Sequence, residues 1–337
     1  MLTAAPNLKL SLLAGALGAA LLSACGGGGS DSETSSSAAA LDDATATTYA
    51  ANATQIASDA GTAADTAVLT AQAVVGATAT ASASEGMATA LSVLPLATTT
   101  RACPGGGTAT LSVTGGTPAS QVNGQLDAGE VYAITFAACA GAAGAAAVDG
   151  ALAMTVLTAS GDSSNGTLAL SLTATDLSVD LPRGGASLNG AVERTVSVST
   201  DSGGVVHLAS HFTTPSLTLA THYNTRSSNF TLSAVDIQRT LTLVGGVPQS
   251  STLSGTHTLS ATLPNASFAY TVSTSGGASY SAAGLPVSGN WTIALPQTLL
   301  GVSIANGSAT LTIDKGKDGS IDRTITVSAP TLGAGAG

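Results

Sequence analysis

Residues 167–176, which read TLALSLTATD, decide the fold that we expect for most of the chain. Leu168, Leu170 and Leu172 occupy every second position, and small or polar residues fill the positions between them. Because successive side chains of a strand point to opposite faces of a sheet, this alternation predicts a strand with one apolar and one polar face.

The same period of two continues from about residue 108 to the end of the chain. Clusters of Gly, Asn, Asp, Ser or Pro separate the alternating segments, which is typical of antiparallel strands joined by turns. We predict a mainly β fold, an antiparallel meander of about a dozen strands. The alternation slips near Asp176 and near Ala234, which indicates bulges or tight turns there. The clearest alternating segments are 217–223, 268–272, 287–295, 309–313 and 321–327.

Two architectures would bury the apolar face of such a meander: a sandwich, or a curved half-barrel closed by a helix. A transmembrane barrel, which would turn that face toward lipid, ranks third. The chain has only five Tyr, four Phe and one Trp to build the two aromatic girdles of a barrel. We assign residues 99–330 to the β domain and residues 331–337 to a flexible tail.

The segment 41–98, which precedes the β domain, is rich in alanine. A helical segment is predicted because a set of its residues recurs at three- and four-residue spacing: Tyr49, Ala53, Ile56, Ala60 and Ala63. A second short helix is expected over residues 85–94, ended by Pro95. The long helix could serve as a strip for a partner, but we favour packing against the β domain. The side chains expected to make that contact are Tyr49, Ile56, Val68 and Leu69.

Residues 1–24 have the pattern of an export signal. Lys9 and the amino terminus are positive, residues 10–22 form a short apolar run, and Ser23 and Ala24 are small. The sequence Leu22-Ser23-Ala24-Cys25 resembles the lipobox of bacterial lipoproteins, which is cut by the lipoprotein signal peptidase. Residues 25–40 then form the lipidated cysteine and a Gly/Ser tether with little to bury.

This resemblance implies that Cys25 becomes the mature amino terminus and carries a diacylglyceryl group and an acyl chain such as palmitate. Two or more chains, each contributing about 0.8 kcal/mol per buried CH₂, anchor a protein stably in a membrane. Gly26 stands where an aspartate would retain a lipoprotein at the inner membrane. The expected location is therefore the outer membrane, facing the periplasm or the cell surface.

Charge excludes one class of partner. From Cys25 onward the chain has eight basic and 19 acidic residues, a formal net charge of −11. Such a chain repels nucleic acids, so no nucleic-acid partner is expected. Charged residues make up only 8% of the sequence, which predicts a surface built largely of Ser, Thr, Asn and Gly.

The cysteines divide into one anchor and one pair. If Cys25 is acylated, Cys103 and Cys139 remain, and an oxidising compartment favours a disulfide between them. A loop of that size constrains the unfolded chain by about 4 kcal/mol in the chain-entropy treatment. The two cysteines lack the paired spacing that zinc sites use.

Two segments partly match a calcium-binding loop. Asn123, Asp127 and Glu130 match its second half, but the first half lacks the required aspartates, so a structural turn is expected. The second segment is weakened by Gly316 and two lysines, and a solvated hairpin explains it more simply. We predict no metal site and no cofactor, and keep as weak calcium candidates Asp314, Asp318 and Asp322.

The remaining residues that could carry chemistry are four histidines and two serine turns. Strand parity places His207, His211 and His222 on the polar face and His257 on the apolar face. Ser202 and Ser163 lie in Gly/Ser turns without any motif of a known hydrolase around them.

The sequence predicts a lipid-anchored cell-envelope protein with a non-catalytic structural or surface-binding role. Its expected partners are the membrane, through the anchor, and an envelope protein, a polysaccharide or a lipid. The first alternative is a periplasmic carrier that holds an apolar ligand between helix and sheet. The second alternative is an envelope hydrolase.

Overall fold

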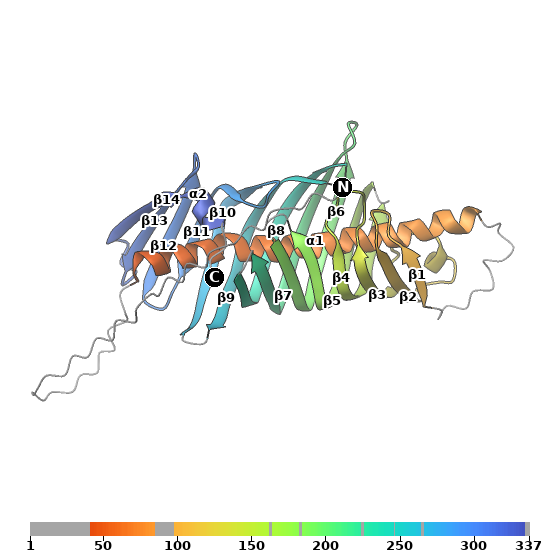
Figure 1. Ribbon diagram of the computed structural model, residues 1–337, viewed down its shortest axis with the longest axis horizontal. Helices are drawn as coiled ribbons and strands as arrows, with labels where there is room; N and C mark the ends of the chain where they lie inside the picture. Colours follow the sequence, from red (N-terminus) through yellow and green to blue (C-terminus); the bar gives the residue numbers. More distant parts are fainter. Residues whose placement is uncertain are drawn as a thin grey trace, which may run out of the picture. The chain divides into compact units, whose positions relative to one another are not determined.

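The computed structural model describes residues 41–84, 98–161, 164–181, 184–223, 226–245, 247–263 and 266–333. The expected signal, the tether with Cys25 and the second helix over residues 85–94 lie outside these ranges. Residues 41–337 form one compact unit. Its described residues form mainly one long helix and one sheet (Figure 1).

The sheet confirms the predicted antiparallel meander, with fourteen strands among the described residues rather than about a dozen. Each strand pairs with its neighbours in chain order, from β1 at one edge to β14 at the other. The strands are β1 (Thr99–Ala102), β2 (Thr108–Gly115), β3 (Glu130–Cys139), β4 (Val148–Gly161), β5 (Asn165–Leu181), β6 (Gly184–Thr200), β7 (Val205–Tyr223), β8 (Arg226–Val244), β9 (Val247–Leu263), β10 (Ala266–Ser281), β11 (Pro286–Ala294), β12 (Thr298–Ala305), β13 (Ser308–Lys315) and β14 (Arg323–Ser328).

The long helix α1 (Asp43–Ser84) crosses the strands one after another (Figure 1). Asp42 caps its start, because the Thr45 amide donates to the Asp42 carboxylate at 2.7 Å. Residues 50–61 of α1 are all buried, whichever side of the helix they occupy. A flat sheet covers only one side of a helix, so the sheet must curve around α1. Of the two predicted architectures, this is the half-barrel filled by a helix.

Alternation sorts each strand into two faces. We call the face that packs on α1 the inner face, and the opposite one the outer face. Leu170 and Leu172 in β5, and Leu217 and Leu219 in β7, are buried on the inner face. Ser and Thr dominate the outer face, as the sequence pattern predicts.

Two short helices complete the unit. The 3₁₀ helix η2 (Ser120–Val122) lies in the loop between β2 and β3, and α2 (Ala329–Gly333) follows β14. The tail predicted from residue 331 is wrong for its first three residues. They belong to α2, where Leu332 is fully buried against the core that α1 shares with the sheet.

The sheet bends at a line of bulges that crosses most of its strands, which we call the crease. The predicted irregularities at Asp176 and Ala234 are confirmed, and Ala138 forms a third, each with φ of 47°. The Asp149 carboxylate accepts a hydrogen bond from the Ala138 amide at 2.7 Å, and Asn189 does the same for Asp176 at 2.7 Å. The pairing register shifts at the crease in β3–β4, β4–β5, β5–β6, β6–β7, β8–β9, β9–β10 and β10–β11.

Glycines lie beside the bulges because the neighbouring backbone comes too close for a side chain. A Cβ atom at Gly150 would lie 2.1 Å from the Asp176 carbonyl oxygen, and one at Gly255 would lie 2.1 Å from that of Asp236. Both glycines also have positive φ, at 96° and 131°. Bulges and glycines bend strands in this way in curved sheets, and here they turn the inner face around α1.

The crease predicts an uneven response to glycine substitution. Gly255→Ala should prevent the sheet from closing on α1 and lower the unfolding free energy by more than about 3 kcal/mol, because backbone must move. Gly204→Ala is the control, since Gly204 has φ of 77° but no atom within 4 Å of the added Cβ, so it should lose only about 1 kcal/mol. Urea unfolding followed by circular dichroism measures both, and equal losses would contradict the steric role of the crease.

Candidate functional site

The most polar point between α1 and the inner face is a buried ion cluster. Asp65 of α1 forms ion pairs with Arg194 of β6 and Arg239 of β8, and none of the three side chains is more than 4% exposed. Arg194 also donates to Ser210 Oγ at 3.0 Å, and Arg239 donates to Thr62 Oγ1 at 2.8 Å. Because buried charges are stable only when paired, the cluster fixes the rotation and position of α1.

Burial perturbs both arginines of the cluster. Burial, together with the positive charge of Arg239, lowers the pKa of Arg194 to about 9. Burial also lowers the pKa of Arg239 to about 10, whereas the charge of Asp59 acts in the opposite direction. Both arginines therefore stay protonated at neutral pH, and the sheet holds two cations against the carboxylate of the helix.

On the amino-terminal side of the cluster, side chains fill the space between α1 and the sheet. The Tyr49 ring lies against Phe268 and Tyr270, with centroids 5.3 and 5.0 Å away. The Tyr280 hydroxyl donates to the Thr54 carbonyl at 2.6 Å. Of the contacts predicted for α1, Ile56 and Val68 are fully buried, while Tyr49 and Leu69 are partly buried against the core.

Three adjacent strands each place a polar atom into this packed region without a hydrogen-bond partner. The atoms are His257 Nε2 in β9, Thr274 Oγ1 in β10 and Trp291 Nε1 in β11, and Thr274 pairs directly with Trp291. Both amide atoms of Gln55 in α1 are likewise buried without a partner. Burial lowers the pKa of His257 to about 4, so this ring is neutral at pH 7. His257 thus lies in the core, as its strand parity predicts.

Packing is looser toward the other end of α1, where a cleft of about 510 Å³ opens. Gln72 and Gly76 of α1 form one wall, and the loop 123–127 forms another. The third wall comes from inner-face residues of β4, β5 and β6: Ala159, Leu168, Val196 and Val198. The cleft thus combines an apolar floor with a polar rim, and its volume lies in the range of small-molecule sites.

The loop beside the cleft is the structural turn that the sequence predicts. Asn123 and Asp127 bond to each other, and the Gln125 amide donates to Asn123 Oδ1 at 2.7 Å. Glu130 accepts from the Asp127 amide at 2.9 Å and from the Tyr132 hydroxyl. Burial and the neighbouring Glu130 carboxylate raise the pKa of Tyr132. Asp127 and Glu130 thus each use one carboxylate oxygen to hold the turn.

The weak calcium candidates lie in the β13–β14 hairpin. Asp314 accepts from the amides of Asp318 and Gly319 at 3.2 and 3.0 Å, and Asp318 accepts from the Ser320 amide at 2.8 Å. Asp322 accepts from the Lys315 amide. Each carboxylate thus supports the turn. In the described part of the chain, no group of three or more His, Cys, Asp or Glu side chains is placed to hold a metal ion.

The remaining candidates lie on the outer face or in turns. His211 contacts Asp236 at 2.8 Å, and His222 contacts Ser227 at 2.8 Å. His207 lies 3.8 Å from Asp201, whose carboxylate accepts the amides of Gly203 and Val205 and shapes the turn that holds Ser202. Ser163 lies outside the described residues.

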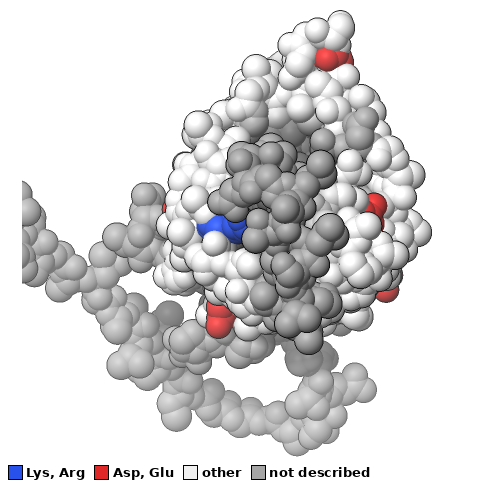
Figure 2. Space-filling view, turned by 90° about the vertical axis from the view of Figure 1, so that its right-hand side faces the viewer, with Lys and Arg blue, Asp and Glu red and all other residues white. Residues whose placement is uncertain are grey.

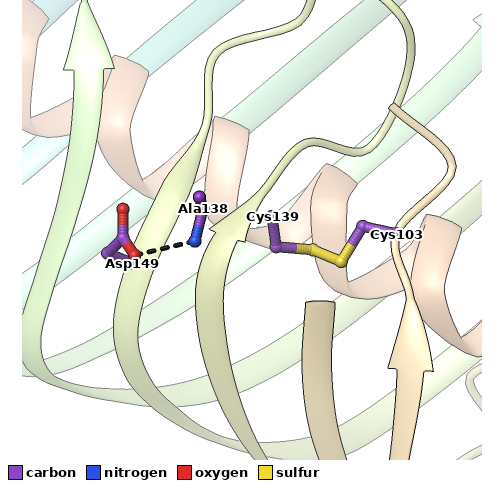
Figure 3. The surroundings of a disulfide bond; sticks show 4 residues. All are labelled: Cys103, Ala138, Cys139 and Asp149. Atoms are coloured by element: carbon purple, nitrogen blue, oxygen red, sulfur yellow. Dashed lines mark hydrogen bonds between the residues drawn. A yellow bond between two sulfur atoms is a disulfide. The ribbon is translucent and has the colours of Figure 1, made fainter. Parts of the chain in front are cut away.

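The predicted disulfide joins Cys103, directly after β1, to Cys139 at the end of β3 (Figure 3). Their Cα atoms are 5.5 Å apart. The bond lies next to the Ala138 bulge that Asp149 caps (Figure 3), so it fastens the first strands where the crease begins.

No known protein family, curated protein or solved structure matches the chain. No described helix has the length and apolar character needed to cross a membrane.

Sequence reasoning missed the ion cluster, although a signal for it was present. Arg194 stands between Val192 and Val196 in the alternation, and Arg239 stands likewise between Ile237 and Leu241. A charge at an apolar position of a strand needs a buried counter-charge. That counter-charge is Asp65, an acid in the middle of the alanine-rich helix.

The ion cluster predicts a large loss of stability when its carboxylate is neutralised. Asp65→Asn removes the carboxylate that both buried arginines share, and we expect the unfolding free energy to fall by about 3 to 5 kcal/mol. Asp43→Asn is the matched control, because Asp43 pairs with Arg323 at 2.6 Å where both side chains are about half exposed. It should cost at most about 1 kcal/mol. Chemical denaturation compares them, and similar losses would contradict a structural role for the cluster.

His257 predicts a loss of stability on acidification. Its pKa is about 4 in the folded protein and about 6.5 in the unfolded chain, so below pH 6.5 the unfolded state binds the extra proton. Stability therefore falls between pH 6.5 and 4 by up to about 3 kcal/mol and then levels off. His257→Met should remove this part of the pH dependence, whereas His211→Met on the outer face should leave it. Unfolding curves at several pH values test this; identical curves for wild type and His257→Met would refute it.

Proposed function

We propose that the protein is a lipid-anchored, non-catalytic module of the cell envelope. Cys25 holds the anchor, residues 26–40 serve as the tether, and the helix-filled sheet is the displayed domain. The proposal places the module at the outer membrane, where it contacts an envelope protein or a polysaccharide.

The observation that carries the proposal is the filled inner face. From Ala46 to Ala71, α1 occupies the space in which a curved sheet could hold a ligand, and Ile56 and Trp291 are each only 2% exposed. The most strongly perturbed charges in that space, Arg194 and Arg239, are engaged with the helix itself. The inner face therefore serves as a structural core, and we assign the contacts with partners to the outer face.

The outer face suits such contacts because it is rich in hydroxyl groups and poor in charge. Thr240 and Thr252 meet across β8 and β9 at 2.7 Å, and Thr167 and Ser197 meet across β5 and β6 at 3.1 Å. Figure 2 views the β1 end of the sheet, where few charged side chains are visible among the described residues. A surface of this kind offers donors and acceptors to a neutral polymer or a polar protein.

The cleft beside Gln72 favours a second candidate, a carrier. Its apolar floor of Leu168, Val196 and Val198 could hold one acyl chain, while Asn123 and Asp127 at the rim would meet a neutral head group. The carrier would then use one end of α1 rather than the whole inner face.

The anchor is tested by the covalent mass of the protein. The wild-type chain, extracted from the envelope and denatured, should begin at residue 25 and carry the mass of a diacylglyceryl group and an acyl chain. The Cys25→Ser variant should lack that added mass and keep residues 1–24. It should also no longer be labelled when cells are grown with labelled palmitate. The matched control is Ser23→Ala, which keeps a small residue before the cysteine. An unlipidated wild-type chain that begins elsewhere would refute the anchor.

Native mass spectrometry of the folded domain separates the two candidates. The domain from residue 41 onward, secreted without its anchor and purified without detergent, should have a bare mass if it is a structural module. Bound phospholipid or fatty acid would instead support the carrier, provided that Val196→Arg in the floor of the cleft abolishes it.

A further inference from the structure

The edge formed by β14 has the properties of a docking strand. Its residues pair with β13 in six successive positions without a register shift, and its other side faces no strand among the described residues. Residues 324–328 read TITVS, with no charge, no proline and four β-branched side chains. A regular, uncharged edge strand presents unpaired backbone groups that recruit another strand.

The opposite edge of the sheet differs from β14 in its length and in the disulfide that follows it. β1 has only four residues, and Arg101 in it is partly buried toward the inner side. The disulfide at Cys103 follows directly after it. A short edge strand is a common device against edge pairing. β14 also has an inward charge, since Arg323 pairs with Asp43 of α1, but this charge stands at the first position of a longer strand. We therefore take β14 as the better of the two described edges for pairing with another strand.

Ile325 and Val327 indicate what the partner strand must supply. Both side chains lie on the inner side of β14 and pack against the core, yet both are only partly buried. A strand added beside β14 would cover them if it carried apolar side chains at alternate positions. β14 itself has this pattern, so a second copy of the same strand is a fitting partner.

One antiparallel register makes β14 complementary to itself. With a two-fold axis at Thr326, each Thr326 lies opposite Thr326 of the second copy, and each Ile325 lies opposite Val327 of the second copy. Thr324 then faces Ser328. Moving the axis to Ile325 would place Arg323 opposite Val327, and moving it to Val327 would leave fewer paired residues. The first register alone pairs like with like and keeps Arg323 outside.

We propose that two copies of the chain associate through their β14 strands in this register, so that one continuous sheet runs through both. The interface is isologous, which is the arrangement of most homodimers. This inference does not depend on the anchor or on the partner proposed above.

A cysteine at the two-fold axis tests the register in the full chain. Directly opposite residues of an antiparallel pair have Cα atoms about 4.5 to 5.5 Å apart, within the range that a disulfide spans. Thr326→Cys should therefore give a covalent dimer on non-reducing electrophoresis of the oxidised protein. The matched control is Thr310→Cys on the same outer face of β13, whose two copies would be about 14 Å apart across three strand spacings. The unsubstituted chain, which also contains Cys25, shows how much covalent dimer forms without the introduced cysteine.

A mass measurement adds a test that needs no cross-link. The detergent-solubilised wild-type chain should have the mass of a dimer by light scattering, and Thr326→Lys should raise the dissociation constant at least tenfold by placing two ammonium groups at the axis. Thr310→Lys should have no such effect, and protease resistance checks the folding of each variant. A monomeric wild type, equal cross-linking of Thr326→Cys and Thr310→Cys, or a Thr326→Cys adduct with a different protein would each overturn the proposal.

Discussion

The structure depends on the covering of one apolar sheet face by one helix. An open sheet of fourteen strands has an inner face that water would otherwise reach, and α1 is the element that excludes it. The dimensions agree. Thirteen strand spacings span about 62 Å, and 42 helical residues span about 63 Å. A helix lying across the strands can therefore reach from the first strands to the last.

Alanine allows the sheet to wrap so closely. A helix with large side chains would keep the walls apart, whereas Ala46, Ala50, Ala53, Ala57 and Ala60 let backbone approach backbone. The disadvantage is weak specificity, because alanines slide past one another without a preferred position. The ion cluster at Asp65 supplies that position, and the crease supplies the curvature that brings β6 and β8 to it. Small residues, buried charge and bulged strands together hold α1 close to the curved sheet in one position.

The sequence predicted those parts of the fold that repeat over many residues. Alternation gave the strands, alanine periodicity gave α1, and the broken parity at Asp176 and Ala234 located two bulges of the crease. It could not choose between a sandwich and a half-barrel, because both bury the same alternating residues. The curvature that selects the half-barrel arises where glycines such as Gly150 and Gly255 lie beside bulges in neighbouring strands. It therefore depends on how the strands pair, which the local sequence does not specify.

The candidate site was less accessible to sequence reasoning. The calcium candidates lie close together in the sequence, whereas Asp65 and Arg239 are 174 residues apart and meet only when the sheet closes. The disulfide was predictable because cysteines are few and one of them was already assigned. The cleft beside Gln72 had no sequence signal, since it arises where the loop 123–127 and the end of α1 approach each other.

The position of α1 at the start of the compact unit has a consequence for how the chain becomes ordered. The helix precedes its partners by a long stretch of chain. Thr54 contacts Tyr280, 226 residues later, and Asp43 contacts Arg323, 280 residues later. Such distant contacts slow folding. A helix rich in alanine and small polar residues exposes few large apolar side chains before the sheet has formed around it. Because exposed apolar surface promotes aggregation of incompletely folded chains, a core helix with few large apolar side chains offers less such surface before the last strands pair.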